Sequence, residues 1–244
     1  MVAKTNMQKL LDPAKNTNKE AKHMDFSGPE TADLSDVRSL NTAFLEYLSG
    51  AEGERFRSEM PASLRLAVKA LSDRHVQRLS TVPFLLMSFR ESDDNYWQQT
   101  LRDMPVRDLF TPAHNDANPC TKIASATLGF LWQLARKNPY AARLVCGASL
   151  QWCEHLAACT LLHVLERAAD DHQTLGPRLA GDKFFWERLL GPGLSSESEI
   201  RRAAHLSALQ SVLTPPATKQ TQQLRAAACY SSVPSVEIRQ QRDK

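Results

Sequence analysis

Apolar residues recur every three or four positions along most of the middle of this chain, which is the spacing of amphipathic helices. The first such pattern begins near Ser39 or Asn41, either of which suits a helix N-cap, and it ends at Gly50. Residues 61–80 continue as two short helices, because Ser72 lies in the middle of this stretch and suits a second N-cap. The first part of the chain is therefore predicted to be helical.

The same periodicity continues through the rest of the chain up to a pair of prolines at 215–216. Helices are predicted over residues 93–103, 123–137, 139–146, 149–169, 182–190 and 195–213. Asn138-Pro139 breaks one of these helices and begins the next, and Gly147 suits a helix C-terminus. A capping-box pattern at Ser195 or Ser196 begins the last one.

One apolar run has no helical period. Residues 81–89, TVPFLLMSF, are short and carry a proline near their start. Periodicity does not decide between a buried strand and a helical turn for such a run, so both remain open.

Polar composition marks the ends of the chain and one internal stretch. Before the first helix, lysines and acidic residues balance and apolar residues are too sparse to offset the entropy of ordering. Three prolines and several Asn and Asp residues mark an internal linker. The predicted organisation is a disordered tail over 1–38, a first helical unit over 39–103, a Pro-rich linker over 104–122, a second unit with a C-terminal helix over 123–214, and a disordered basic, Gln-rich tail over 215–244.

The two helical units follow one plan, which suggests a duplication. Corresponding residues recur in the same order at an offset that drifts only from 86 to 89. The pairs are Phe44 with Phe130, Leu45 with Leu131, His75 with His163, Trp97 with Trp186, and Leu101 with Leu190. Chance alignment of two Leu- and Ala-rich stretches is the alternative. The correspondence fails where the apolar run 81–89 meets the polar DDHQTLGPRL at 170–179.

Composition agrees with an all-α protein of two tandem units. Hydrophobic residues make up 42% of the 244 residues, and only 9 are glycine, which is few for an all-β protein. The net charge of +3 permits contact with nucleic acid but does not demand it. Five cysteines at irregular spacing argue against a disulfide framework, and no apolar run approaches membrane-spanning length. We expect a reduced, cytoplasmic protein without a membrane segment.

A cluster of cysteine and histidine is the best candidate for chemistry. His155, Cys159 and His163 are spaced i, i+4 and i+8, so a continuous helix would place them on one face. Cys153 or Cys146 could join them as zinc ligands. A helix break expected near Cys159 would destroy this alignment, and buried cysteine packs well as a small hydrophobe. We therefore predict core packing and no metal site.

Other residue patterns give no catalytic site either. Nothing marks a Cys–His nucleophile pair, and the sequence holds no phosphate-binding or dinucleotide fingerprint. Adjacent aspartates, as in Asp93-Asp94 and Asp170-Asp171, point apart on a helix and suit loops. The four tryptophans lie among Leu and Phe at helical spacing, which indicates packing rather than base stacking: Trp97, Trp132, Trp152 and Trp186. Arg201-Arg202 and the basic tail could touch phosphates, although a solvated surface is the default. We expect no enzyme and no cofactor.

The second unit resembles the D subunit of the flagellar master transcriptional regulator, the FlhD family. The resemblance covers residues 131–169, LWQLARKNPYAARLVCGASLQWCEHLAACTLLHVLERAA. In that family a long helix ends in a polar break, an Ala-containing helix closes with Gly, and two short helices follow. Here Asn138 lies at the break, Ala141-Ala142 in the short helix, Gly147 at its end, and Thr160 in the final pair.

The resemblance implies a bacterial helical protein that forms oligomers and positions a separate DNA-binding partner. Such a co-regulator makes few base contacts itself, so its own DNA contact would be indirect or weak. A protein-interaction adaptor or secretion-associated factor that never meets DNA is the alternative, because duplicated helical units with exposed apolar faces serve binding equally well. Both functions require a protein partner.

Overall fold

The computed structural model describes residues 27–93, 96–97, 118–170 and 175–214. The expected disordered tails before 27 and after 214, and most of the predicted linker, lie outside these residues. Helices dominate the described part, which confirms the predicted all-α class. Within it, no helix is long and apolar enough to cross a membrane.

The described residues of the first half, up to Ser88, form α-helices, a 3-10 turn and a short strand. They are α1 (Thr31–Ser49), η1 (Ala51–Gly53), α2 (Glu54–Ser58), α3 (Ala62–Lys69), α4 (Asp73–Leu79) and β1 (Met87–Ser88). Ser72 caps α4, as predicted, by accepting from the His75 backbone N–H at 3.4 Å. Tyr96 and Trp97 are helical, and the rest of the predicted helix over 93–103 lies outside the described residues.

The second half supplies a longer series. It comprises α6 (Pro119–Lys137), α7 (Pro139–Cys146), α8 (Leu150–Ala158), α9 (Leu161–Asp170), β2 (Gly176–Pro177), α10 (Lys183–Leu190), η2 (Pro192–Leu194) and α11 (Ser198–Leu213). Asn138 caps α7 through its side-chain oxygen, which accepts from Tyr140 N–H and Ala141 N–H at 3.1 Å each. Gly147 ends α7 at φ 67°, a left-handed conformation that favours glycine. Both breaks agree with the sequence prediction.

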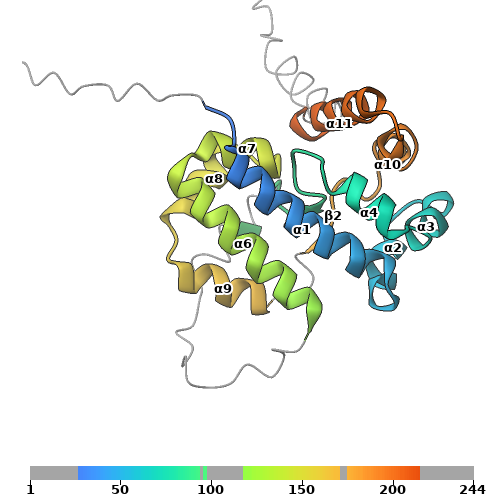
Figure 1. Ribbon diagram of the computed structural model, residues 1–244. Helices are drawn as coiled ribbons and strands as arrows, with labels where there is room; N and C mark the ends of the chain where they lie inside the picture. The colour runs from blue at the N-terminus through green and yellow to red at the C-terminus, as the bar shows by residue number, and fades with distance from the viewer. Residues whose placement is uncertain (1–26, 94–95, 98–117, 171–174, 215–244) are drawn as a thin grey trace, which may run out of the picture.

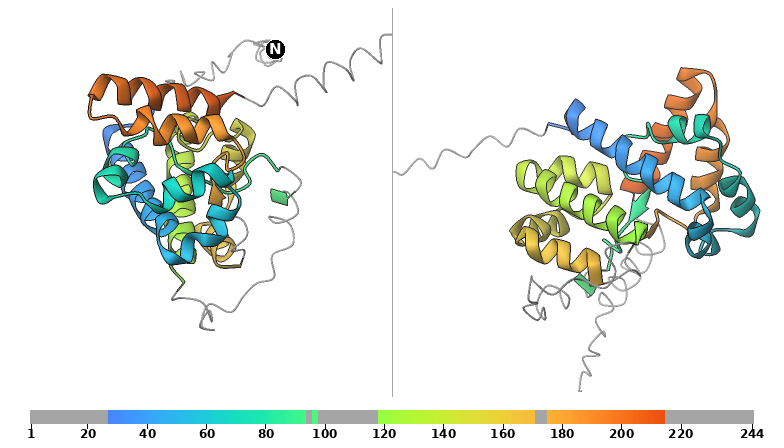
Figure 2. Two further views of the ribbon diagram at one scale, coloured as in Figure 1. Left: turned by 90° about the vertical axis from the view of Figure 1, so that its right-hand side faces the viewer. Right: turned by 60° about the horizontal axis from the view of Figure 1, so that its bottom comes forward.

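Helices α1 and α6 lie side by side across the middle of the molecule (Figures 1 and 2). Helices α7, α8 and α9 pack around α6, whereas α3 and α4 pack on α1. Helix α10 packs on α3 and also contacts α11. The end of the second half therefore lies against the first half. One continuous hydrophobic cluster includes residues from both halves. The two predicted units therefore share a core.

Three predicted boundaries were wrong. Helix α1 begins eight residues before Ser39, at Thr31, because Glu30 and Asp33 form a reciprocal capping box and Val37 is buried on the core face. Helix α6 begins at Pro119, inside the predicted linker, with Asn118 as its cap. Helix α11 has no capping box at Ser195 or Ser196; the Ser195 hydroxyl instead accepts from Glu197 N–H, and the helix begins at Ser198.

In the apolar run 81–89, a turn at Thr81 and bends over residues 82–84 lead into a short strand at Met87–Ser88, so the run contains a strand and no helix. Its strand β1 pairs antiparallel with β2, in the register Met87 with Pro177 and Ser88 with Gly176. Gly176 and Pro177, which pair with this run, belong to the polar stretch 170–179, where the sequence correspondence failed. The two halves of the chain meet here.

Candidate functional site: a buried joint and an exposed leucine face

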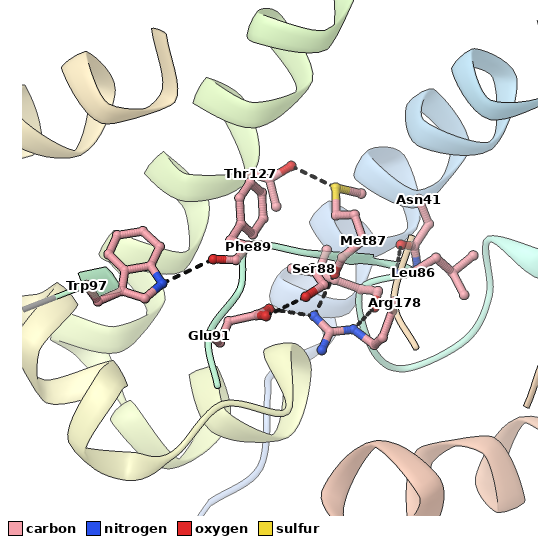
Figure 3. A network of polar contacts seen from close by, with 10 residues as sticks. Asn41, Leu86, Met87, Ser88, Phe89, Glu91, Trp97, Thr127 and Arg178 are labelled. Carbon is pink, nitrogen blue, oxygen red and sulfur yellow. Dashed lines mark hydrogen bonds and ion pairs between the residues drawn. The ribbon is translucent and has the colours of Figure 1, made fainter. Parts of the chain in front are cut away.

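Side chains from both halves hold the apolar run 81–89 by its backbone (Figure 3). The Asn41 amide on α1 donates to Phe84 C=O and accepts from Leu86 N–H, both at 2.8 Å. The Thr127 hydroxyl on α6 lies 3.3 Å from Met87 Sδ in the same segment. Asn41 and Thr127 are fully buried, so these bonds replace the water that the polar groups lose on folding.

A buried ion pair completes this joint. The Arg178 guanidinium, just after β2, donates to Leu85 C=O and Met87 C=O at 2.6 Å each and pairs with the Glu91 carboxylate at 2.9 Å. The Ser88 hydroxyl donates to the second Glu91 oxygen at 2.6 Å. Removing one partner of a buried pair typically costs about 3–5 kcal/mol, because an uncompensated charge stays behind. Loss of either Glu91 or Arg178 would therefore leave a buried charge without its partner.

A tryptophan motif follows each strand and has the same geometry in both halves. The Trp97 indole N–H donates to Phe89 C=O at 3.1 Å, and the Trp186 indole donates to Arg178 C=O at 3.0 Å. Each ring meets the preceding aromatic edge-on, at 5.6 Å for Tyr96 and 5.7 Å for Phe185. The predicted correspondence of Trp97 and Trp186 thus extends to their hydrogen bonds and neighbours.

The turns that lead into these tryptophans also match. Arg90 and Leu179 both adopt positive φ, at 56° and 47°, which is uncommon for residues other than glycine. Asp93 N–H donates to Arg90 C=O at 2.9 Å, and Asp182 N–H donates to Leu179 C=O at 2.8 Å. Each aspartate side chain then accepts a backbone N–H three residues later at 3.0 Å. Asp93 is therefore a turn and capping residue.

The short helices before the joint correspond as well. Buried Leu64 and Val68 of α3 stand 88 residues before buried Trp152 and Leu156 of α8. Val76 of α4 stands 88 residues before Val164 of α9, and both are buried. The same core positions are therefore apolar in both halves.

The outer face of α9 breaks this correspondence. Leu161, Leu162 and Leu165 are 41%, 40% and 38% exposed. We call these three residues the leucine face. The equivalent positions on α4, also exposed, are polar: Asp73, Arg74 and Gln77. Three exposed leucines on α9 thus stand 88 residues after three exposed polar residues on α4.

The structure disperses the cysteine and histidine candidates. Helix α8 ends at Ala158 and α9 begins at Leu161, so the predicted break separates His155 from His163, and both are exposed. Cys159 is half-buried at the break, where burial raises its pKa. In the described part of the chain, no three His, Cys, Asp or Glu side chains are grouped to hold a metal ion.

Two buried cysteines do come together. Burial raises the pKa of the Cys146 thiol well above its usual value, and a hydrogen bond with Cys153 adds to the effect. A thiol that stays protonated is a poor nucleophile and metal ligand. Cys146 and Cys153 are both fully buried and pack in the hydrophobic core.

The tryptophans and arginines mostly behave as packing residues. Trp97, Trp152 and Trp186 are buried, which confirms the packing prediction, and half-buried Trp132 lies under the Arg136 guanidinium. Arg201 donates to Ser195 C=O at 2.7 Å, and Arg202 is exposed. Asp94, Asp171 and Leu101 lie outside the described residues, as do the side-chain surroundings of Asp170.

Sequence reasoning missed the joint and the leucine face. Asn41 was singled out only as a helix cap, and Glu91 and Arg178 carried no local signal because their partners are distant in sequence. The leucine face was detectable in principle, since aligning α4 with α9 through His75 and His163 sets three leucines against three polar residues.

Comparisons with known proteins gave no match. No protein-family model, no curated protein and no solved structure matches this chain.

Proposed function

We propose that this protein is a bacterial, cytoplasmic transcriptional co-regulator of the FlhD type, which acts by binding a separate DNA-binding protein. The leucine face of α9 carries the proposal. Its three exposed leucines offer apolar surface to a partner, whereas the corresponding positions of α4 are polar.

The local structure of residues 131–169 supports the resemblance. The polar break at Asn138, the left-handed Gly147 and the pair α8–α9 are the features that the resemblance implies. The leucine face lies on the last helix of this stretch. Burial of the leucine face against a partner would stabilise the complex by about 25 cal/mol for each Å² of apolar surface removed from water. Such binding would leave the joint undisturbed.

An affinity pull-down of the tagged protein from its native cells, with and without nuclease, tests the proposal. The decisive variant carries α4's residues on α9: L161D, L162R and L165Q together. We expect the wild type to retain a stoichiometric partner with a DNA-binding domain after nuclease treatment, and the variant to lose it. L206Q changes an exposed leucine on α11 and serves as the matched control, which should keep the partner.

A protein-interaction adaptor or secretion-associated factor without DNA contact is the second proposal. Helix α9 itself carries the acidic Glu166 beside the basic Arg167, and therefore no run of basic residues for phosphates. A partner that stays bound after nuclease treatment, binds through α9 and has no DNA-binding domain would support the adaptor proposal. If the triple variant retains every partner that the wild type binds, the co-regulator proposal and the adaptor proposal are both refuted.

A further inference from the structure

The end of each half of this chain completes the core of the other half. Trp97, from the first half, packs edge-on against Trp152 of α8 in the second half, with ring centroids 5.4 Å apart. Phe185, from α10 of the second half, packs on Phe84 of the first at 6.1 Å, and α10 lies against α3. The aromatic helices are thus exchanged between the halves.

The strand pairing has the symmetry that such an exchange needs. Met87 pairs with Pro177, and Ser88 pairs with Gly176. The matched tryptophan motifs stand 89 residues apart (Trp97 against Trp186), and the same shift carries Met87 to Gly176 and Ser88 to Pro177. The shift therefore maps the antiparallel pairing onto itself, as a two-fold axis between two equal units would.

We infer that the chain is a duplicated unit joined to itself about a pseudo-two-fold axis, and that the same joint accepts a second copy of the chain. Because each unit is completed by its counterpart, unit 1 of one copy can be completed by unit 2 of another, with every contact of the joint kept. Such exchange is a low-cost route to a dimer. The 14 residues of the predicted linker before the α6 cap, 104–117, can span roughly 46–50 Å when extended, which exceeds the roughly 28 Å length of a 19-residue helix such as α6.

The buried ion pair allows a direct test with full-length chains. Glu91→Met leaves Arg178 unpaired in its own chain, and Arg178→Met leaves Glu91 unpaired in its own. In an exchanged dimer of the two variants, one joint has both wild-type residues and the other has two methionines. No unpaired buried charge remains, so mixing should rescue both chains.

The two variants are unfolded together in denaturant and refolded as a mixture and separately. We expect the mixture to give a 1:1 heterodimer by native mass spectrometry, with a Tm roughly 10 °C above that of either variant alone. The E91M/R178M chain is the matched control: it carries both changes in cis, should be monomeric at low concentration, and should gain nothing on mixing with itself. Failure of either variant to fold alone leaves the test intact, because rescue on mixing is then the readout.

A mixture that melts as the sum of its parts, with no heterodimer, overturns the inference. A second measurement applies if both single variants are as stable as the wild type. Tagged and untagged wild-type chains are then refolded together at about 100 µM, and capture of the untagged chain supports the exchange, whereas its complete absence overturns it. Neither outcome depends on the co-regulator proposal, which concerns the face of α9.

Discussion

Replacing Asn41 with leucine tests the claim that one buried amide holds the apolar run 81–89 in place. The change keeps the branched shape and the number of side-chain heavy atoms but removes the bonds to Phe84 C=O and Leu86 N–H. Asn41 is fully buried, so water cannot replace either bond. Two unsatisfied backbone groups cost about 1–3 kcal/mol each, which predicts a total loss of about 2–6 kcal/mol in the free energy of unfolding.

Thr127→Val is the matched control for this change. Thr127 reaches the same segment from α6, but its hydroxyl contacts a thioether sulfur and its own helix carbonyl, Ile123 C=O. No backbone group of the apolar run loses its partner, so the expected cost is below about 1 kcal/mol.

Urea unfolding followed by far-UV circular dichroism measures both variants. The midpoint of Asn41→Leu should fall while the m-value stays constant, because the surface exposed on unfolding is unchanged. A free energy of unfolding within about 0.5 kcal/mol of the wild type would refute the reasoning, because most exposed surface substitutions fall in that range.

Three further outcomes follow from single sites. Burial lowers the pKa of His205, which hydrogen-bonds Gly193 C=O, so the folded state binds its proton less readily than the unfolded state. Above the unfolded pKa, His205 is neutral in both states and stability is not reduced; stability is lost as the pH falls from the unfolded pKa towards the lower folded pKa. The free energy of unfolding should therefore decrease from pH 7 to pH 5 by more in the wild type than in His205→Gln. Gly147→Ala should cost more than about 1 kcal/mol by thermal melting, since φ is positive and a Cβ would meet Val212 Cγ1. Trp97→Phe and Trp186→Phe should each lower the free energy of unfolding in urea by more than about 1 kcal/mol, because each leaves a carbonyl without its indole donor and removes part of a buried ring.

Helical periodicity predicted most of the fold because the core faces of these helices are regular. The caps at Ser72 and Asn138 and the stop at Gly147 depend on local backbone chemistry, which a sequence displays directly. The start of α1 was missed because carboxylates at Glu30 and Asp33 make its capping box and only sparse apolar residues mark its first turns. Local signals therefore placed most elements but not every boundary.

The joint could not be predicted from local signals. Arg178 stands in a polar, Gly-Pro stretch and gains its partners only when that stretch pairs with residues 85–91. The same pairing explains why the correspondence between the two halves fails at residues 81–89 and 170–179. The first segment is an apolar run, whereas the second supplies the buried charge of Arg178. The tryptophan correspondence was visible in the sequence because the motif is local to each half.

Hydrogen exchange on the purified protein with its captured partner is the most direct test of the proposed function. The co-regulator account predicts slower exchange in the complex for α9, around Leu161 and Leu165, and no change for the equivalent helix α4. Equal protection of α4 and α9, or protection confined to other helices, would contradict the assignment of partner binding to the leucine face.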